Sequence, residues 1–298
     1  MLPFIDDILR YDSLSIVGLE KNTGKTECLK YVLDRLPVQD KRIAVTSIGI
    51  DGESVDQVTR TQKPEIVLPE GMYFGTSEMH YRQRRLTSEL IDVSDESTSL
   101  GRVVTAKALT RGKILLSGPS SASSLKRWMG EMQHRFSIDL VVIDGALSRL
   151  SSASPAVSQS MILATGAAYS ANIATLVNKT AFVVDLVNLD LTSEANIRLL
   201  EPLDKGLWFI DKDDTLHSLD SLTSLSKDIH FEGMDGCKTL YVAGALVDGF
   251  LEKVRKNKDL KQVELVVRDF TKIFVTPQQF RLFIKSGGRI RVLQKSKL

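Results

Sequence analysis

Cysteine is scarce in this sequence of 298 residues, which contains only Cys28 and Cys237. The two cysteines lie far apart and have no spacing typical of metal ligands, so neither a disulfide scaffold nor a cysteine-based metal site is expected. The four histidines form no close pair in the sequence, which gives no support to a metal centre or a histidine-based triad. The low cysteine count fits a protein of a reducing compartment.

A surplus of charge of either sign is also missing. Lysine and arginine number 39 against 37 aspartates and glutamates, and a net charge of +2 does not favour nucleic acid or an anionic membrane as main partner. No apolar run approaches the roughly 20 residues of a membrane span, and Asp6 and Asp7 stand where a signal peptide would carry basic residues. We therefore expect a cytoplasmic protein without nucleic-acid or membrane partners, with a homo- or hetero-oligomer left open.

The sequence does contain a succession of short apolar runs. With 43% hydrophobic and 26% charged residues, the chain can form one large core or two modest ones. The run at 140–143 has no alternation, which is typical of a strand covered on both faces. Strands are expected over 13–18, 42–48, 65–68, 113–117, 139–143, 161–164 and 180–186, and helices over 24–36, 123–135 and 167–178. This order predicts an α/β fold with a mostly parallel sheet between helix layers.

Two parts of the chain depart from this pattern. Residues 65–117 combine brief strands, turn residues and charges, and predict a β-rich insertion in which 101–108 and 113–117 form a hairpin-like pair. We expect a first domain over 1–190 and a smaller α/β region over 191–298. In the latter, strands are expected over 240–243, 264–267 and 290–293, and helices over 246–254 and 276–286.

The most informative segment lies between the first expected strand and the first expected helix. It reads Gly18-Leu19-Glu20-Lys21-Asn22-Thr23-Gly24-Lys25-Thr26. A loop that holds a triphosphate needs inward backbone N–H groups, glycines for close approach, a lysine for the β and γ oxygens and a hydroxyl for Mg²⁺. The segment offers all four, and the helix after it would direct its amino terminus at the phosphates. It predicts a P-loop NTPase-like domain that binds ATP and Mg²⁺.

Within this loop, Lys25 would bind phosphate and Thr26 would ligate magnesium. Gly18 and Gly24 enclose five residues, where the common pattern has four. Lys21 is either a second phosphate-facing cation or an exposed lysine, and the whole segment has the alternative interpretation of a glycine turn that enters a structural helix. The expected nucleotide-binding residues are Gly18, Lys21, Asn22, Thr23, Gly24, Lys25, Thr26 and Glu27.

A P-loop needs an acidic partner at the end of a neighbouring strand to hold the magnesium shell. Asp144 directly follows the expected strand 139–143, and we interpret it as this acid and as a metal ligand; the alternative is a helix-capping aspartate. Asp51 follows the strand 42–48 and would orient water or sense the γ-phosphate, or else it forms an ordinary Asp-Gly turn. The expected catalytic residues are Lys25, Asp51 and Asp144.

A second glycine turn follows the expected strand 161–164. Its residues 165–168, Thr-Gly-Ala-Ala, have two interpretations. They form a second binding site for an anion or ligand, or they are small residues that let helix and sheet pack closely, and we favour close packing. The Asn/Thr-Lys-x-Asp signature that reads guanine is not evident, because Asn178-Lys179 continues as Thr180-Ala181. Adenine is therefore preferred over guanine.

Four segments in combination resemble one protein family. They are Gly-Leu-Glu-Lys-Asn-Thr-Gly-Lys-Thr-Glu at 18–27, Thr-Ser-Ile-Gly-Ile-Asp-Gly-Glu at 46–53, Ser-Gly-Pro-Ser at 117–120 and Ile-Asp-Gly-Ala-Leu-Ser-Arg at 143–149. Together they make the first 190 residues similar to the P-loop subunit of the lysine 5,6-aminomutase reactivases. The loop alone is shared with other cofactor-assembly ATPases.

The resemblance implies a chaperone-like ATPase that works with a second reactivase subunit on an adenosylcobalamin-dependent aminomutase of lysine fermentation. Such a protein uses ATP and Mg²⁺ to eject damaged cobalamin. By position, the resemblance assigns phosphate and magnesium to Lys25 and Thr26, the strand-end acid to Asp144 and a switch region to Asp51. Two alternatives stay open: an ATP-dependent biosynthetic ligase or kinase, and a nucleotide-switch scaffold that binds partners without turnover.

Overall fold

The computed structural model describes residues 4–48, 65–146, 157–219, 223–225, 229, 231, 234, 236–260 and 262–298. The predicted switch residue Asp51 lies outside the described residues. The chain divides into two compact units, an amino-terminal unit of Met1–Thr180 with Ser296–Leu298 and a carboxyl-terminal unit of Ala181–Lys295. The division falls inside the helix Ile173–Val187, so the predicted boundary near residue 190 lies beyond the end of that helix.

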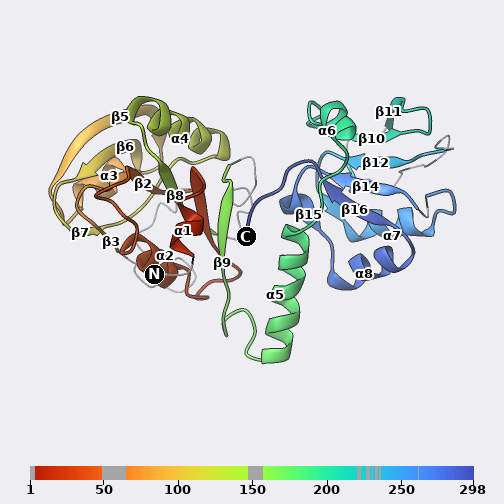
Figure 1. Ribbon diagram of the computed structural model, residues 1–298, viewed down its shortest axis with the longest axis horizontal. Coiled ribbons are helices and arrows are strands. Elements are labelled where there is room, and N and C mark those ends of the chain that lie inside the picture. The colour runs from red at the N-terminus through yellow and green to blue at the C-terminus, as the bar shows by residue number, and fades with distance from the viewer. Residues whose placement is uncertain are drawn as a thin grey trace. The chain divides into compact units, whose positions relative to one another are not determined.

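The amino-terminal unit is built on a seven-stranded sheet in the order β5-β6-β4-β2-β8-β1-β9 (Figure 1). Its elements are α1 Ile5–Ile8, β1 Ser13–Gly18, α2 Lys25–Leu33, β2 Ile43–Ser47, β3 Ile66–Leu68, β4 Tyr73–Ser77, α3 Glu78–Arg82, β5 Ser88–Thr98, β6 Gly101–Ala108, β7 Gly112–Ile114, α4 Ala122–Phe136, β8 Leu140–Ala146, β9 Ser160–Ala164 and the first part of α5 Ile173–Val187. Strands β4, β2, β8, β1 and β9 are parallel to one another, whereas β6 is antiparallel to β4 and β5 is antiparallel to β6. The predicted α/β class is confirmed as a mixed, largely parallel sheet with helices.

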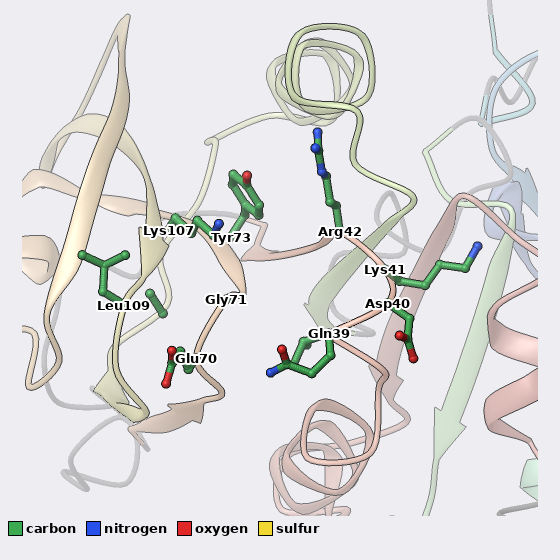
Figure 2. Close-up of a pocket in the computed structure, with 11 residues that line it drawn as sticks. Gln39, Asp40, Lys41, Arg42, Glu70, Gly71, Tyr73, Lys107 and Leu109 are labelled. Carbon is green, nitrogen blue, oxygen red and sulfur yellow. The ribbon is translucent and has the colours of Figure 1, made fainter.

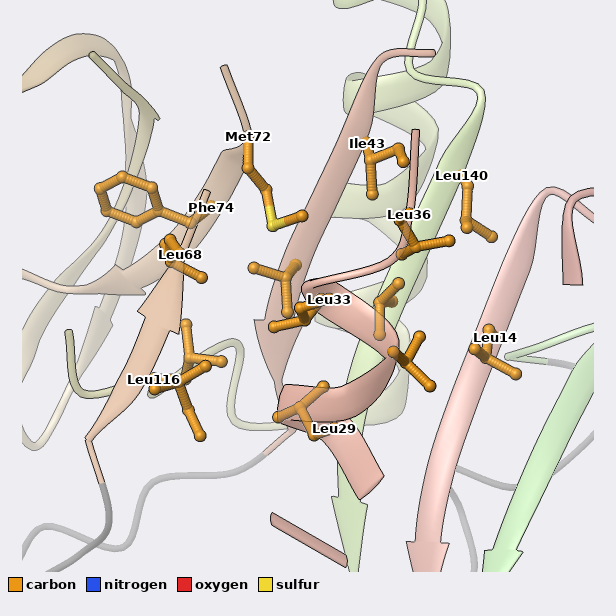
Figure 3. Close-up of a cluster of buried hydrophobic side chains, with 14 of the residues drawn as sticks. Leu14, Leu29, Leu33, Leu36, Ile43, Leu68, Met72, Phe74, Leu116 and Leu140 are labelled. Atoms are coloured by element: carbon orange, nitrogen blue, oxygen red, sulfur yellow. The ribbon is translucent and has the colours of Figure 1, made fainter. Parts of the chain in front are cut away.

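Helices cover both faces of this sheet, as the unbroken apolar runs predicted. On one face, Leu29, Val32 and Leu33 of α2 pack with alternate strand residues such as Leu140 and Val142 (Figure 3). On the other face, α4 contributes Leu125, Trp128, Met129 and Met132, which pack with Val141 and Ile143. Adjacent strand residues point to opposite faces of a sheet. Because both faces are covered here, every residue of β1 and most residues of β8 are buried.

The predicted hairpin between 101–108 and 113–117 is wrong. Strand β6 pairs with β4 and with β5, whereas β7 pairs with β3. The β-rich segment therefore adds three strands, β4, β5 and β6, to the main sheet, and β3 and β7 pair in a separate two-stranded sheet. The missed partner, β5, carries Glu89, Asp92 and Asp95 among its apolar residues, and a half-exposed edge strand of this kind lacks the apolar run that identifies a buried one.

The predicted strand 180–186 is also wrong, because these residues belong to helix α5. A short apolar run does not distinguish a buried strand from a helix, and length decides between them. Here the helix continues for 15 residues, from Ile173 to Val187. Within it, Phe182 and Leu186 are buried at helical spacing, and the ring of Phe182 lies 5.5 Å from that of Phe280.

The carboxyl-terminal unit contains a five-stranded sheet in the order β11-β10-β12-β14-β16. Its elements are α6 Glu194–Leu200, β10 Leu207–Ile210, β11 Leu216–Leu219, β12 Thr239–Val242, β13 Leu246–Val247, α7 Asp248–Lys256, β14 Glu264–Val267, a 3₁₀ helix Phe270–Lys272, β15 Ile273–Phe274, α8 Pro277–Lys285 and β16 Arg289–Val292. Strands β12, β14 and β16 are parallel and are joined through α7 and α8. Leu200 of α6 packs on one sheet face with Tyr241 and Val266, and Figure 1 shows α7 and α8 on the other side.

A polar contact closes the turn between β10 and β11. His217 Nε2 donates to Asp211 Oδ2 at 2.7 Å, and the backbone N–H groups of Asp213 and Thr215 donate to Asp211 Oδ1. The hydrogen bond from His217, followed by that from Thr215, lowers the pKa of Asp211 from its ordinary value of 3.8.

Replacing Asp211 with asparagine should therefore lower the free energy of unfolding near neutral pH. A carboxylate whose pKa is lowered in the folded state stabilises the protein above its unfolded pKa, and this contribution is lost as the pH falls through the folded value. The difference between wild type and Asp211→Asn in urea unfolding should thus be full at pH 6 and shrink below pH 3.8. Asp213→Asn, at an exposed neighbouring position, is the matched control; a difference that persists unchanged at low pH contradicts the prediction.

Candidate phosphate-binding site

The segment between β1 and α2 lies at the sheet edge where the parallel strands end. In the ladder, Gly18 lies opposite Ala146 of β8 and Ala164 of β9. Residues that follow parallel strands converge at the same edge of a sheet. The loop of residues 18–26, named the candidate phosphate loop from here on, is therefore adjacent to the carboxyl ends of β8 and β9.

The backbone of this loop requires glycine at two points. A Cβ atom added at Gly18 would lie 2.8 Å from Thr23 Oγ1, so any other residue would displace Thr23, whose side chain is buried. Gly24 has a φ of 87° and Asn22 a φ of 61°, both in the left-handed region that glycine adopts freely and asparagine tolerates. These glycines thus let the chain fold back on itself before α2 begins.

The fifth residue between the two glycines is accommodated by a tight turn. Thr23 Oγ1 donates to the carbonyl of Glu20 at 2.8 Å, and the backbone N–H of Lys21 donates to Glu20 Oε1 at 3.0 Å. Leu19 N–H donates to the carbonyl of Ala164 at 2.9 Å, which ties the start of the loop to the end of β9. Glu20 therefore stabilises the turn of the loop, a role that the sequence alone did not predict.

Lys25 and Asp144 are brought together by the fold. Lys25 Nζ lies 2.7 Å from Asp144 Oδ1, and their side chains are 26% and 14% exposed. Asp144 is paired in register with Ile16 on one side and Ser47 on the other, which places it near the carboxyl ends of three strands. The contact is an ion pair, and the Oδ1 atom that forms it is buried.

Helix α2 begins at the loop without a side-chain cap. Its N-cap, Gly24, has no side chain to accept a hydrogen bond from the backbone, so the first N–H groups of the helix depend on other acceptors. Thr26 is half-buried in the first turn. Glu27, also predicted to bind nucleotide, has a side chain that is 77% exposed and pairs with Lys30 at 2.8 Å.

The turn after β9 lies beside the candidate phosphate loop. A Cβ atom at Gly166 would come within 3.7 Å of the Thr23 carbonyl oxygen, and Tyr169 N–H donates to the Gly166 carbonyl at 2.8 Å. The ring of Tyr169 carries the ammonium of Lys179 at 5.0 Å from its centroid. The sequence analysis singled out residues 165–168 but not Tyr169 and Lys179. The signal that could have identified Tyr169 is its position as an aromatic residue directly after the glycine turn.

A buried polar network lies at the carboxyl end of β4. His80 is 1% exposed, and its Nδ1 lies 2.8 Å from Ser117 Oγ, which also accepts the N–H of Ser77 at 3.0 Å. This histidine is thus a hydrogen-bonded core residue. In the described ranges, no group of three or more His, Cys, Asp or Glu side chains is arranged to hold a metal ion.

A cavity of about 470 Å³ lies at the opposite edge of the sheet (Figure 2). It is lined by residues before β2 and β4 and by the end of β6: residues 38–42, Glu70, Gly71, Tyr73 and residues 107–109. Since β2 and β4 are parallel to β1, their amino ends are remote from the edge that carries the candidate phosphate loop. The cavity is therefore separate from that loop.

Comparison with known proteins identifies no relative: no family model, no curated protein and no solved structure matches this chain. Within the described residues, none of the helices combines the length and the apolar character that crossing a membrane requires.

Proposed function

We propose that this chain binds the Mg²⁺ complex of a nucleoside triphosphate, ATP by preference, in the candidate phosphate loop, and that it hydrolyses the nucleotide. The observation that carries the proposal is the 2.7 Å contact between Lys25 Nζ and Asp144 Oδ1. A lysine at the start of a helix and an acid at the end of the adjacent strand are the two charges that a P-loop site needs. These two residues meet although they are 119 positions apart in the sequence.

The residues present fit a magnesium-bound polyphosphate. The buried Asp144 Oδ1 has the Lys25 ammonium as its partner at 2.7 Å, and the amino terminus of α2 has no side-chain cap. Thr26 and Asp144 would hold the Mg²⁺ shell, Lys25 would bind the β and γ oxygens, and N–H groups from Gly18 to Thr26 would surround the phosphates. When bound, Mg²⁺ neutralises negative charge that develops on the phosphate oxygens.

The finer proposal is a reactivase subunit, and it rests on the sequence resemblance. In it, ATP hydrolysis helps a second reactivase subunit to replace damaged cobalamin in an adenosylcobalamin-dependent lysine aminomutase. Removal of a tightly bound cofactor requires a conformational change, and loops that contact the γ-phosphate can bias one. The rival functions are a biosynthetic ligase or kinase and a nucleotide switch.

ATP turnover distinguishes these three functions. We expect slow ATP hydrolysis by the chain alone. The rate should increase clearly when the second reactivase subunit and a cobalamin-inactivated aminomutase are added, because hydrolysis is then coupled to the conformational change that removes the cofactor. The aminomutase with intact cofactor is the control. Turnover that depends on a small-molecule substrate alone would indicate a ligase or kinase, and tight nucleotide binding with no turnover under any condition would indicate a switch.

A further inference from the structure

The segment after β9 is fastened to the candidate phosphate loop. Leu19 N–H donates to the Ala164 carbonyl at 2.9 Å, and the turn at Gly166 lies against Thr23, whose carbonyl oxygen would be 3.7 Å from a Cβ atom added at Gly166. The turn closed by the bond from Tyr169 N–H to the Gly166 carbonyl then places Tyr169 next to the loop. Any ligand whose phosphates occupy the loop therefore has an aromatic side chain at its flank.

The environment of Tyr169 supports this placement. Burial, together with the carboxylate of Glu20 in the loop, raises the pKa of Tyr169, so the ring stays a neutral phenol. Lys179 Nζ lies 5.0 Å from the ring centroid. The hydroxyls of Thr165 and Thr180 lie 3.1 Å apart and join the turn to the helix that carries Lys179. Ring and ammonium are thus held together beside the loop.

We propose that the ring of Tyr169 is the platform on which the base of the bound nucleotide stacks, with Lys179 donating a hydrogen bond to the edge of that base. This inference rests on the proposed function. Aromatic side chains stack on the π-face of any base. A lysine ammonium has donors only, and N7 is an acceptor that both purines present and pyrimidines lack. The proposed ligand class is a purine nucleoside triphosphate.

The test compares the affinities of Mg²⁺ complexes of ATP, GTP, CTP and inorganic tripolyphosphate for the full chain by calorimetry. Wild type should bind ATP and GTP more tightly than CTP. Tyr169→Ala should weaken the affinities for ATP and GTP roughly 5- to 150-fold, the range that follows from the loss of one base-stacking ring, and should leave the affinity for tripolyphosphate unchanged. Tyr169→Phe keeps the ring and should retain the affinity for ATP, whereas Lys179→Gln should reduce the preference for ATP over CTP.

Tyr73→Ala is the matched control. Its ring also carries a lysine ammonium, Lys107 Nζ at 5.5 Å, but lies at the opposite sheet edge, so all four affinities should stay unchanged. Equal losses for ATP and tripolyphosphate in Tyr169→Ala would mean that the ring only supports the loop, and would overturn the inference. Unchanged ATP affinity would overturn it too and leave the phosphate site intact. If wild type binds neither tripolyphosphate nor any nucleotide, the proposed function itself fails.

Discussion

Replacing Lys25 with alanine is expected to abolish measurable binding of Mg·ATP. Hydrogen bonds to charged groups are the strong ones, and Lys25 is proposed to contact both the β- and γ-phosphate oxygens. Loss of its ammonium should therefore weaken binding roughly 100-fold or more. The removal also leaves the Asp144 carboxylate without its 2.7 Å partner, so a bare negative charge would face the incoming phosphates. Calorimetry with the Mg²⁺ complex of ATP measures the loss directly.

Lys30→Ala is the control for this experiment. Lys30 lies on the same helix and also forms an ion pair, with the largely exposed Glu27 at 2.8 Å, so its removal changes the charge of α2 equally. It should leave ATP affinity close to that of wild type. Circular dichroism and thermal unfolding of both variants separate a loss of fold from a loss of binding. Folded Lys25→Ala protein with wild-type ATP affinity would refute the proposed site.

Replacing Gly118 with alanine is expected to destabilise the amino-terminal unit strongly. A Cβ atom at Gly118 would overlap the Ser47 carbonyl oxygen and press on Thr46 Oγ1. Both neighbours belong to β2, a buried central strand, and a backbone atom cannot rotate away as the end of a long side chain can. Overpacking of this kind costs on the order of 3 kcal/mol of unfolding free energy, which urea unfolding resolves easily.

The clash also lies close to the candidate site. Ser47 is paired with Asp144 in the ladder, so a displaced β2 end would move the acid that faces Lys25. Gly130→Ala is the matched control: Gly130 lies within helix α4 and no atom comes within 4 Å of its added Cβ. Because alanine favours helix over glycine, this change should stabilise by up to about 1 kcal/mol. Equal stabilities of the two variants would show that the Gly118 approach is not needed.

The strands that flank the candidate site could be predicted because a strand buried on both faces has an unbroken run of apolar residues. The expected strand 13–18 agrees with β1, and the run 139–143 lies within β8 apart from its first residue. Asp144 was found because an acid at the end of such a run is an exception to its apolar character. What the sequence could not supply is the register of β1 with β8, and hence the contact of Lys25 with Asp144, since strand order depends on packing between distant segments.

The remaining misses have physical causes in particular elements. The second half of helix α5 was assigned to a strand because residues 180–186 form a short apolar run, whereas its first residues lie in the predicted helix 167–178. Tyr169 was overlooked because its proximity to the loop depends on Gly166 packing against Thr23, a contact between two turns that share no local pattern. Asp51 lies outside the described residues, and its predicted role stays a prediction.

The acidic edge strand β5 has a consequence for how this protein behaves at high concentration. Within the described part of the chain, β5 pairs with β6 alone, so the other side of this 11-residue edge strand presents backbone groups on which another chain could align and extend the sheet. Glu89 and Asp95 are exposed on this strand, and Asp92 is half-buried. If two copies met edge to edge, their carboxylates would be brought close across the new ladder, where like charges repel. The acidic residues that interrupt the apolar pattern of β5, and so prevented its prediction as a strand, thus also oppose aggregation of the folded chain through that edge.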